Sequence, residues 1–123
     1  MIIEIPDIHP SINTWKNWHW AVFSKEKKRW AEMIGWLCKG LTPIEGKVFV
    51  TITVYFGTKH RHDYDNYTPK FILDPIVEAK LIADDSSKVI TELRLKFSYD
   101  KDHPRTEVLI EEDEKDKSER MAF

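Results

Sequence analysis

Three aspartates in the middle of the sequence offer the clearest chemistry in the chain. Asp63 and Asp65 stand two residues apart, and Asp85 is the second residue of an Asp-Asp pair that follows an apolar segment, 71–82. If Asp63 and Asp65 end a strand, the alternation of side chains points both carboxylates to one side. A helix over the apolar segment can then fold back and bring Asp85 near them. Because clustered carboxylates repel one another at neutral pH, such a cluster indicates a bound cation.

Other common types of site fit this region poorly. Taken singly, segment 63–66 is also typical of the acidic start of a helix, and segment 84–87 is typical of a turn. A calcium loop of the EF-hand type requires Asp or Asn and then Gly where the chain has Tyr67 and Thr68. The sequence has no Cys and His set with zinc spacing, no phosphate-binding glycine loop and no pattern that supports a catalytic triad.

Length and composition indicate one domain in a reducing compartment. A chain of 123 residues buries a core without disulfide or metal support. The single cysteine, Cys38, is expected to be a small buried hydrophobe. Since neither a signal peptide nor a membrane-length apolar run is visible, we expect a soluble, cytoplasmic protein. Residues 100–123 hold nine acidic and five basic side chains, so that residues 1–99 carry a net charge of +2, which is compatible with a polyanionic partner.

The hydrophobic pattern predicts an α+β domain of two layers, with helices packed on a mixed β-sheet. The expected order is strand, helix, strand, helix, strand, strand, at residues 2–5, 24–39, 47–56, from 68 onward, 88–99 and 106–111. The last two strands are expected to form a hairpin. In strand 88–99, five apolar residues are predicted to face inward: Val89, Leu93, Leu95, Phe97 and Tyr99. The domain is expected to span 1–112, followed by a charged, disordered tail, 113–123.

The second helix carries an internal proline. Thr68 and Pro69 are typical of a helix start, with a capping hydroxyl and a proline at the first helical position. Pro75 removes a backbone donor inside the helix and clashes with the preceding turn. We therefore expect a kink there, or a restart capped by Asp74.

The N-terminal third combines basic and aromatic residues in a way that suits nucleic acid. Lysine and arginine side chains can meet phosphates, and tryptophan rings can stack on unpaired bases. The residues concerned are Lys16, Lys25, Lys27, Lys28 and Arg29, interleaved with Trp15, Trp18 and Trp20. Periodicity alone favours the alternative, a solvated helix face whose tryptophans pack on the sheet.

Taken together, these features resemble the RusA family of Holliday junction resolvases, which are small endonucleases often encoded by prophages. The resemblance is strongest over residues 61–89, which hold a basic residue, Asp-x-Asp-Asn, a following lysine, an apolar helix and an Asp-Asp-Ser turn. Segment 10–13, Pro-Ser-Ile-Asn, is similar to the N-terminal motif of the family. The resemblance implies a homodimer acting in DNA recombination and repair, with one magnesium-dependent site per subunit, each cutting one strand of a four-way junction.

The resemblance also implies roles for individual residues. Asp63 and Asp65 match the paired catalytic aspartates, Asp85 matches the third, and Lys70 is the nearest match to the conserved lysine. The three carboxylates would bind Mg²⁺, or Mn²⁺ in its place, and Lys70 would balance charge on the phosphate. Residues expected to support the ligands are Asn66 and Asp84, and those expected to contact DNA are Lys16, Lys27, Lys28, Arg29 and Arg61. His60 and His62 would position the DNA backbone or play a structural part.

Three departures from the family pattern bear on the structure. Lys70 follows Asp65 by five residues where the family has four, and Pro75 stands where a helix-forming residue is usual. Lys80 stands where the family tends to have a glycine that closes the helix, so we expect Lys80 at positive φ. None of the three removes a carboxylate.

Three rival functions remain open at the level of sequence. The first is a nuclease for another branched or single-stranded DNA, and the second is a non-catalytic junction-binding protein of the same fold. The intact carboxylate set argues against the second, because a protein that only binds gains nothing from negative charge near phosphates. A structural phage protein, which would bind neither DNA nor metal, is a more distant alternative.

Overall fold

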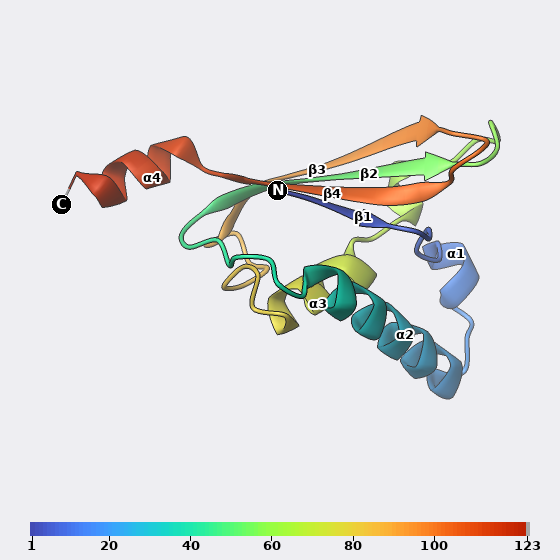
Figure 1. Cartoon of the computed structure of the whole chain (residues 1–123). Coiled ribbons are helices and arrows are strands. Elements are labelled where there is room, and N and C mark those ends of the chain that lie inside the picture. Colours follow the sequence, from blue (N-terminus) through green and yellow to red (C-terminus); the bar gives the residue numbers. More distant parts are fainter. Residues whose placement is uncertain (123) are drawn as a thin grey trace.

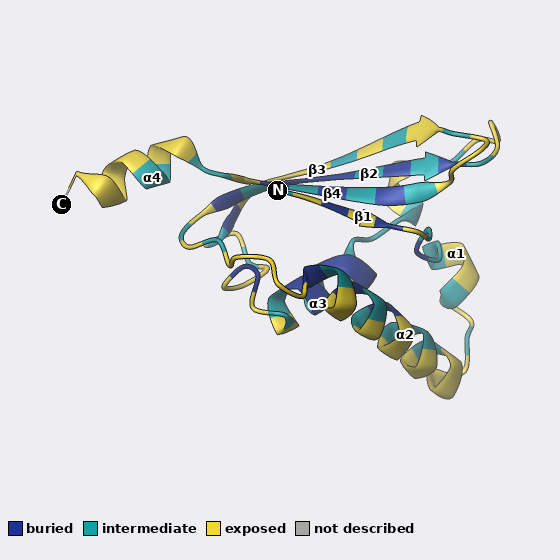
Figure 2. Cartoon of the chain, in the orientation of Figure 1, coloured by how far each residue is buried: buried dark blue, intermediate teal, exposed yellow. Residues whose placement is uncertain are grey.

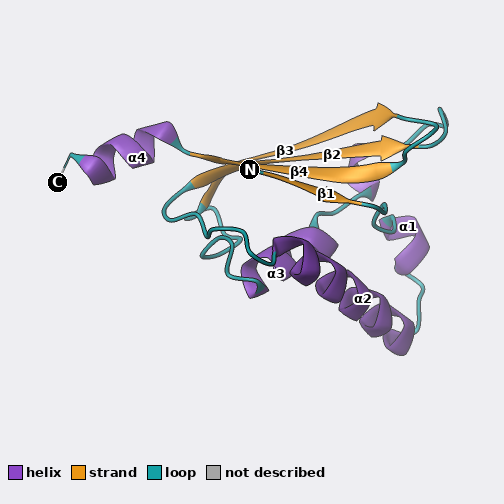
Figure 3. Cartoon of the chain, viewed as in Figure 1, coloured by secondary structure: helices purple, strands orange, loops and turns teal. Residues whose placement is uncertain are grey.

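A four-stranded mixed sheet, covered by helices on one face, is the frame of the chain (Figure 1). The computed structural model describes residues 1–122. The elements are β1 (Ile2–Ile5), α1 (Ile12–Trp15), α2 (Trp20–Cys38), β2 (Val48–Phe56), the 3-10 helix η1 (Tyr64–Asn66), α3 (Lys70–Glu78), β3 (Ile90–Tyr99), β4 (Arg105–Glu112) and α4 (Glu114–Met121). The two-layer α+β class and the strand and helix order are confirmed, with α1, η1 and α4 added (Figure 3). No helix in the described part of the chain is long and apolar enough to cross a membrane.

Strand β2 lies inside the sheet and organises it. The strand order is β1-β4-β2-β3, in which β2 pairs parallel with β3 and antiparallel with β4. Every second residue of β2 is buried against the helices: Val48, Val50, Ile52, Val54 and Phe56. This alternation is the one that the sequence predicts, because successive side chains of a strand point to opposite faces.

The strand β4 does not form the expected hairpin with β3. The two strands lie on opposite sides of β2, and β4 also pairs with β1. A short turn between consecutive strands is typical of a hairpin, but strong apolar alternation in β2 makes it the better partner for both neighbours. The prediction of a hairpin was therefore wrong.

Helices α2 and α3 pack on one face of the sheet and close the core (Figure 2). Trp30 and Ile34 of α2 and Phe71, Ile72 and Ile76 of α3 are fully buried. Burial of each such aliphatic or aromatic side chain stabilises the fold by about 1.5–3 kcal/mol. Cys38 is also buried, as expected, and burial raises the pKa of its thiol.

Helix α2 begins four residues before the predicted start at Ser24. His19 caps it, since its ring Nδ1 accepts a hydrogen bond of 3.2 Å from the backbone N–H of Ala21. A histidine in this position is not among the usual capping residues, which explains why the start is hard to place from sequence.

The edge strand β3 is less buried than its sequence predicts. Leu95 and Phe97 are half-buried, but Leu93 and Tyr99 are 45% and 41% exposed. The register between β2 and β3 shifts at the start of the pair, where Phe49 lies opposite Glu92 and Thr91 has no partner. Alternation therefore predicts the side of the sheet correctly but not whether another element covers it.

The tail, expected to be disordered, forms helix α4 as far as the structure describes it. The Asp113 side chain accepts hydrogen bonds from the N–H groups of Lys115 and Asp116 and so caps the helix. Asp116 in turn accepts from the backbone N–H of Lys47 at 3.0 Å, and this bond is the main cause of its lowered pKa. Arg120 pairs with Asp116 and donates to the carbonyl of Glu45. Phe123, the last residue of the predicted tail, lies outside the described residues.

Helix α3 continues through Pro75 as one helix, without the expected restart at Asp74, and ends in a Schellman motif. The N–H of Leu81 donates to the carbonyl of Ile76, and the N–H of Lys80 donates to that of Val77. This motif holds Lys80 at a φ of 61°, as predicted.

Replacing Lys80 by glycine is expected to raise the free energy of unfolding by about 1 kcal/mol, because a left-handed backbone strains any residue with a Cβ. Urea unfolding of Lys80→Gly beside the wild type measures the difference. Glu78→Gly, in the last turn of the same helix, serves as control and is expected to destabilise the protein. A Lys80→Gly variant less stable than the wild type would show that the Lys80 side chain matters more than its backbone.

His9 is a buried titratable residue in this core. Its ring lies edge-on to the rings of Trp30 and Tyr67, with centroids 6.2 and 5.6 Å away. Neither ring nitrogen has a hydrogen-bond partner in the described structure. Burial lowers the pKa of His9 to about 4, so the ring is neutral in the folded protein at neutral pH.

The stability contributed by neutral His9 is fully present above pH 6.5 and is lost as the pH falls from 6.5 towards 4, because the unfolded chain binds the proton first. Between pH 7 and pH 5 the wild type is expected to lose about 2 kcal/mol more stability than His9→Leu. Chemical unfolding at both pH values tests this, with the exposed His60→Gln as control. An equal loss in wild type and His9→Leu would contradict the burial of a neutral ring.

Candidate active site

The segment between β2 and α3 carries Asp63 and Asp65 and is fixed to the end of the sheet by aromatic stacking. The ring of His62 stacks on Phe56 at a centroid distance of 3.6 Å, and the ring of Tyr64 stacks on Phe97 at 4.2 Å. Both aspartates are exposed. The chain therefore presents two carboxylates to solvent on a short, anchored turn.

This turn is not the strand end that the sequence suggests. Asp63 has an extended backbone, with φ of −98° and ψ of 135°, but Asp65 lies inside η1. The alternation of a strand consequently does not place the two side chains. Asp63 Oδ1 accepts a hydrogen bond from Arg61 Nε at 3.0 Å.

Asn66 connects this turn to the N-terminal motif. Its side-chain oxygen accepts a hydrogen bond of 2.9 Å from the backbone N–H of Asn13. Ser11, two residues earlier, caps α1 by accepting from the N–H of Thr14. The motif 10–13 is recognisable in the sequence without an evident role, and the structure gives it one, which is to support the aspartate turn.

Asp85 lies at the opposite end of the sheet from the aspartate turn. The carbonyl of Ser86, the next residue, accepts from the N–H groups of Val89 and Ile90, and Ile90 pairs with Val48 at the start of β2. Tyr64, in contrast, rests on Phe97 near the end of β3. Seven residue steps separate Ile90 from Phe97, which is roughly 23 Å of strand. The links before and after α3 accordingly lie at opposite ends of the sheet (Figure 1).

The expected cluster of three carboxylates is thus not formed within one chain. Among residues 1–122 no group of three His, Cys, Asp or Glu side chains could hold a metal ion. The pKa of Asp85 is raised, first by desolvation and then by the charges of Asp84 and Asp74. Hydrogen bonding from Ser86 lowers the pKa of Asp84. The carboxylate neighbours of Asp85 are therefore those of α3 and its own turn.

Asp63 and Asp65 nevertheless fit a magnesium site. Mg²⁺ takes oxygen ligands, keeps several waters and is often bound by one or two carboxylates together with substrate phosphate. Two exposed carboxylates on one turn meet that requirement, and no cation other than Arg61 neutralises Asp63 in the described chain. Asp85 of the same chain does not join them.

Lys70 belongs to a basic group between α2 and α3. Lys27, Lys28 and Lys70 line a cavity of about 160 Å³ together with Asp74. Lys27 Nζ lies 3.8 Å from an oxygen of Asp74, and Lys70 Nζ lies 5.7 Å from the centre of the Phe23 ring. Glu78 also lines this cavity, so three ammonium groups and two carboxylates leave it net positive, with Lys70 at the start of α3.

The remaining predicted DNA contacts divide into free and engaged residues. Lys16 is exposed. Arg29 is engaged on both sides, with Nη2 at 2.7 Å from oxygens of Asp7 and Glu26. Arg61 pairs with Asp63, but both side chains are exposed, and such pairs contribute less than about 1 kcal/mol. Arg61 can thus exchange this partner for a phosphate, whereas Arg29 has a structural part.

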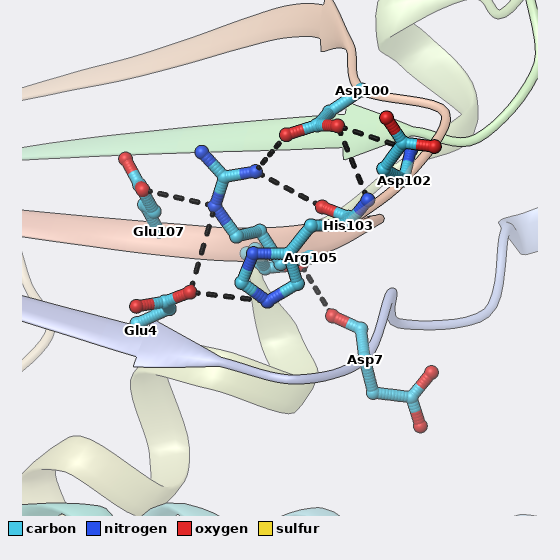
Figure 4. Close-up of polar contacts among 8 residues, drawn as sticks. Glu4, Asp7, Asp100, Asp102, His103, Arg105 and Glu107 are labelled. Atoms are coloured by element: carbon cyan, nitrogen blue, oxygen red, sulfur yellow. Dashed lines mark hydrogen bonds and ion pairs between the residues drawn. The ribbon is translucent and has the colours of Figure 1, made fainter.

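An ion-pair network around Arg105 holds the end of β3 and the turn that follows it (Figure 4). Arg105 Nη1 lies 2.8 Å from Asp100, and its Nε lies 3.1 Å from Glu107. The guanidinium also covers the ring of Tyr55, 3.8 Å from its centre, and Arg105 lowers the pKa of Asp100. The N–H of Asp100 donates to the carbonyl of Phe56. Sequence reasoning missed this network, which fixes the strand ends on which His62 and Tyr64 rest.

Comparison with known proteins identifies one matching family. The family model described as "Endodeoxyribonuclease RusA" matches residues 5–111, which include β2, β3, all of β4 but its last residue, and the three aspartates Asp63, Asp65 and Asp85, but only Ile5 of β1. No curated protein matches the chain significantly. Since the match covers most of the 123 residues, the chain belongs to the RusA endodeoxyribonuclease family.

Proposed function

We propose that this protein is a homodimeric, Mg²⁺-dependent endonuclease that resolves four-way DNA junctions by paired, symmetric nicks. The observation that supports the proposal most is the exposed, anchored turn with Asp63 and Asp65 in a chain of the RusA endodeoxyribonuclease family. Hydrolysis of a phosphodiester requires neutralisation of the phosphate and an activated water, and a carboxylate-bound cation meets both needs.

The residues of this chain would divide the work as follows. Asp63 and Asp65 would hold Mg²⁺, which when bound supplies positive charge to the scissile phosphate and favours ionisation of water. Lys70, at the start of α3, would stabilise negative charge that develops on the phosphate oxygens. Asn66 keeps the turn in place through its bond to Asn13.

Binding of the DNA backbone would rest on the basic group beside the turn. Lys27, Lys28 and Lys70 line one cavity, and Arg61 lies two residues before Asp63. These contacts with phosphate position the substrate and carry no sequence information. Because bound lysines release counterions from DNA, affinity is expected to fall steeply with salt.

Asp65→Asn is expected to lower cleavage of a four-way junction by at least about a thousandfold. The amide is a poor ligand for Mg²⁺, and loss of the carboxylate removes the negative charge that binds the ion. Junction binding should be retained, because phosphate contacts dominate affinity. Cleavage and gel-shift assays on the same preparation separate the two effects.

Glu119→Gln in α4 serves as the matched control, because it removes one exposed carboxylate far from the turn in the sequence. It should cut and bind as the wild type does. Full cleavage by Asp65→Asn would contradict the assignment of Asp65 to the active site.

The homodimer would also explain the position of Asp85. One chain holds Asp85 at the far end of the sheet from Asp63 and Asp65, so a site with three carboxylates cannot form within it as it stands. We propose that Asp85 of one subunit completes the site of the other. The exposed edge of β3, where the side chain of Leu93 is 45% exposed, gives a second copy surface to cover.

A mixed dimer of Asp65→Asn and Asp85→Asn subunits tests this arrangement, because neither variant alone has an intact site. If the carboxylates come from two subunits, the mixed dimer regains one complete site and nicks one strand of a junction. Differently tagged subunits, co-expressed and purified through both tags, provide the sample. A mixed dimer as inactive as its parents would assign all three carboxylates to one chain.

The non-catalytic alternative has one observation in its favour, which is the lack of a three-carboxylate group within the described residues of one chain. It predicts tight, salt-sensitive binding of branched DNA and no cutting with any divalent metal. A nuclease for another branched DNA would cut with metal but show no preference for four-way junctions.

A further inference from the structure

An aromatic and basic groove lies directly beside the aspartate turn. Its volume is about 430 Å³, and the residues that matter in its lining are Lys59, His60, His62, Tyr64, Phe97 and Tyr99. The groove is formed where the chain leaves β2 and where β3 ends, so it shares Tyr64 with the aspartate turn itself.

Tyr64 is an exposed ring on a rigid support. One face stacks on Phe97 at a centroid distance of 4.2 Å and an interplanar angle of 18°. Phe97 in turn packs edge-on against buried Phe56, which stacks on His62. Tyr64 is nonetheless 57% exposed. A flat aromatic surface with fixed orientation is thus presented to solvent.

The rest of the groove adds a second ring and positive charge. Tyr99 lies two residues after Phe97, on the same side of β3, and Lys59 Nζ lies 5.0 Å from the centre of its ring. Lys59, His60 and Arg61 are consecutive and exposed. Flat rings beside a basic track are the features with which proteins bind unpaired nucleotides, because rings stack on bases and cations meet phosphates.

We propose that this groove binds an unpaired nucleobase of the DNA substrate, stacked on Tyr64, with Lys59 and His60 at its backbone phosphate. The inference rests on the proposed nuclease function and specifies its substrate as DNA with an unstacked base beside the cut. Tyr64 stands between Asp63 and Asp65 in the chain, so a base on its ring places the adjoining phosphate near both carboxylates. In a continuous duplex both faces of each base are covered by its neighbours, so a base must first unstack before it can stack on the ring of Tyr64.

The test measures stacking without cleavage, in full-length protein with EDTA. The probes are a short oligothymidylate and a four-way junction with 2-aminopurine at the branch, whose fluorescence falls when it stacks on an aromatic ring. The wild type and Tyr64→Phe are expected to quench 2-aminopurine alike. Tyr64→Leu should lose the quenching and bind oligothymidylate about tenfold more weakly, with its affinity for linear duplex unchanged.

Two further variants test whether the effect belongs to the groove. Tyr99→Leu tests the groove independently of the aspartate turn and should also weaken binding of oligothymidylate. Trp36→Leu removes an exposed aromatic ring from α2, outside the groove, and should change nothing. Circular dichroism of each variant shows that it is folded.

Quenching by Tyr64→Leu at the wild-type level, or an equal loss of its affinity for linear duplex, would overturn the proposal that the groove binds an unpaired base. So would a change of oligomeric state in Tyr64→Leu without a change in DNA binding, because a second copy would then be the occupant. If the wild type quenches 2-aminopurine but never cuts a junction with Mg²⁺, base binding in the groove would be supported and the proposed nuclease function would be contradicted. If the wild type cuts junctions and Tyr64→Leu still quenches 2-aminopurine, the nuclease function would be supported and stacking of a base on Tyr64 would be contradicted.

Discussion

Parallel pairing of β2 with β3 is the constraint on which the rest of this structure depends. Two consecutive parallel strands need a crossover that returns the chain to the starting end of the sheet, and here α3 makes the return. The link before α3 therefore lies at one end of the sheet and the link after it at the other. The first link carries Asp63, Tyr64 and Asp65, and the second carries Asp85. The same crossover therefore places α3 on one face of the sheet and separates Asp85 from Asp63 and Asp65.

Local patterns in the sequence account for much of the fold. The alternation of β2 predicts its buried face, and the resemblance to a family with a glycine at the position of Lys80 predicts the positive φ of that residue. Features that depend on distant partners escape such reasoning. Strand β4 passes over to the far side of β2, and the helix in the tail is joined to the domain by the bond between Asp116 and the backbone of Lys47. Neither contact leaves a periodic trace in the chain.

The candidate site shows the same division. Residue types and spacing single out Asp63, Asp65, Asn66 and the motif 10–13 as separate features, and the structure adds the hydrogen bond between Asn66 and Asn13 that joins them. They are not enough to place Asp85, because a linear sequence does not reveal at which end of a sheet a crossover ends. Arg29 is a further instance, since its ion pair with Asp7 depends on how α2 lies beside the end of β1.

Cleavage of a mobile four-way junction, labelled on each strand in turn and compared with linear duplex of the same sequence, tests the central claim most directly. The reactions are run with Mg²⁺ and with EDTA. The account predicts paired, symmetric nicks in two opposing strands of the junction only, abolished by EDTA. Equal cutting of the linear duplex, or binding of the junction without nicks at any concentration of Mg²⁺, would contradict it.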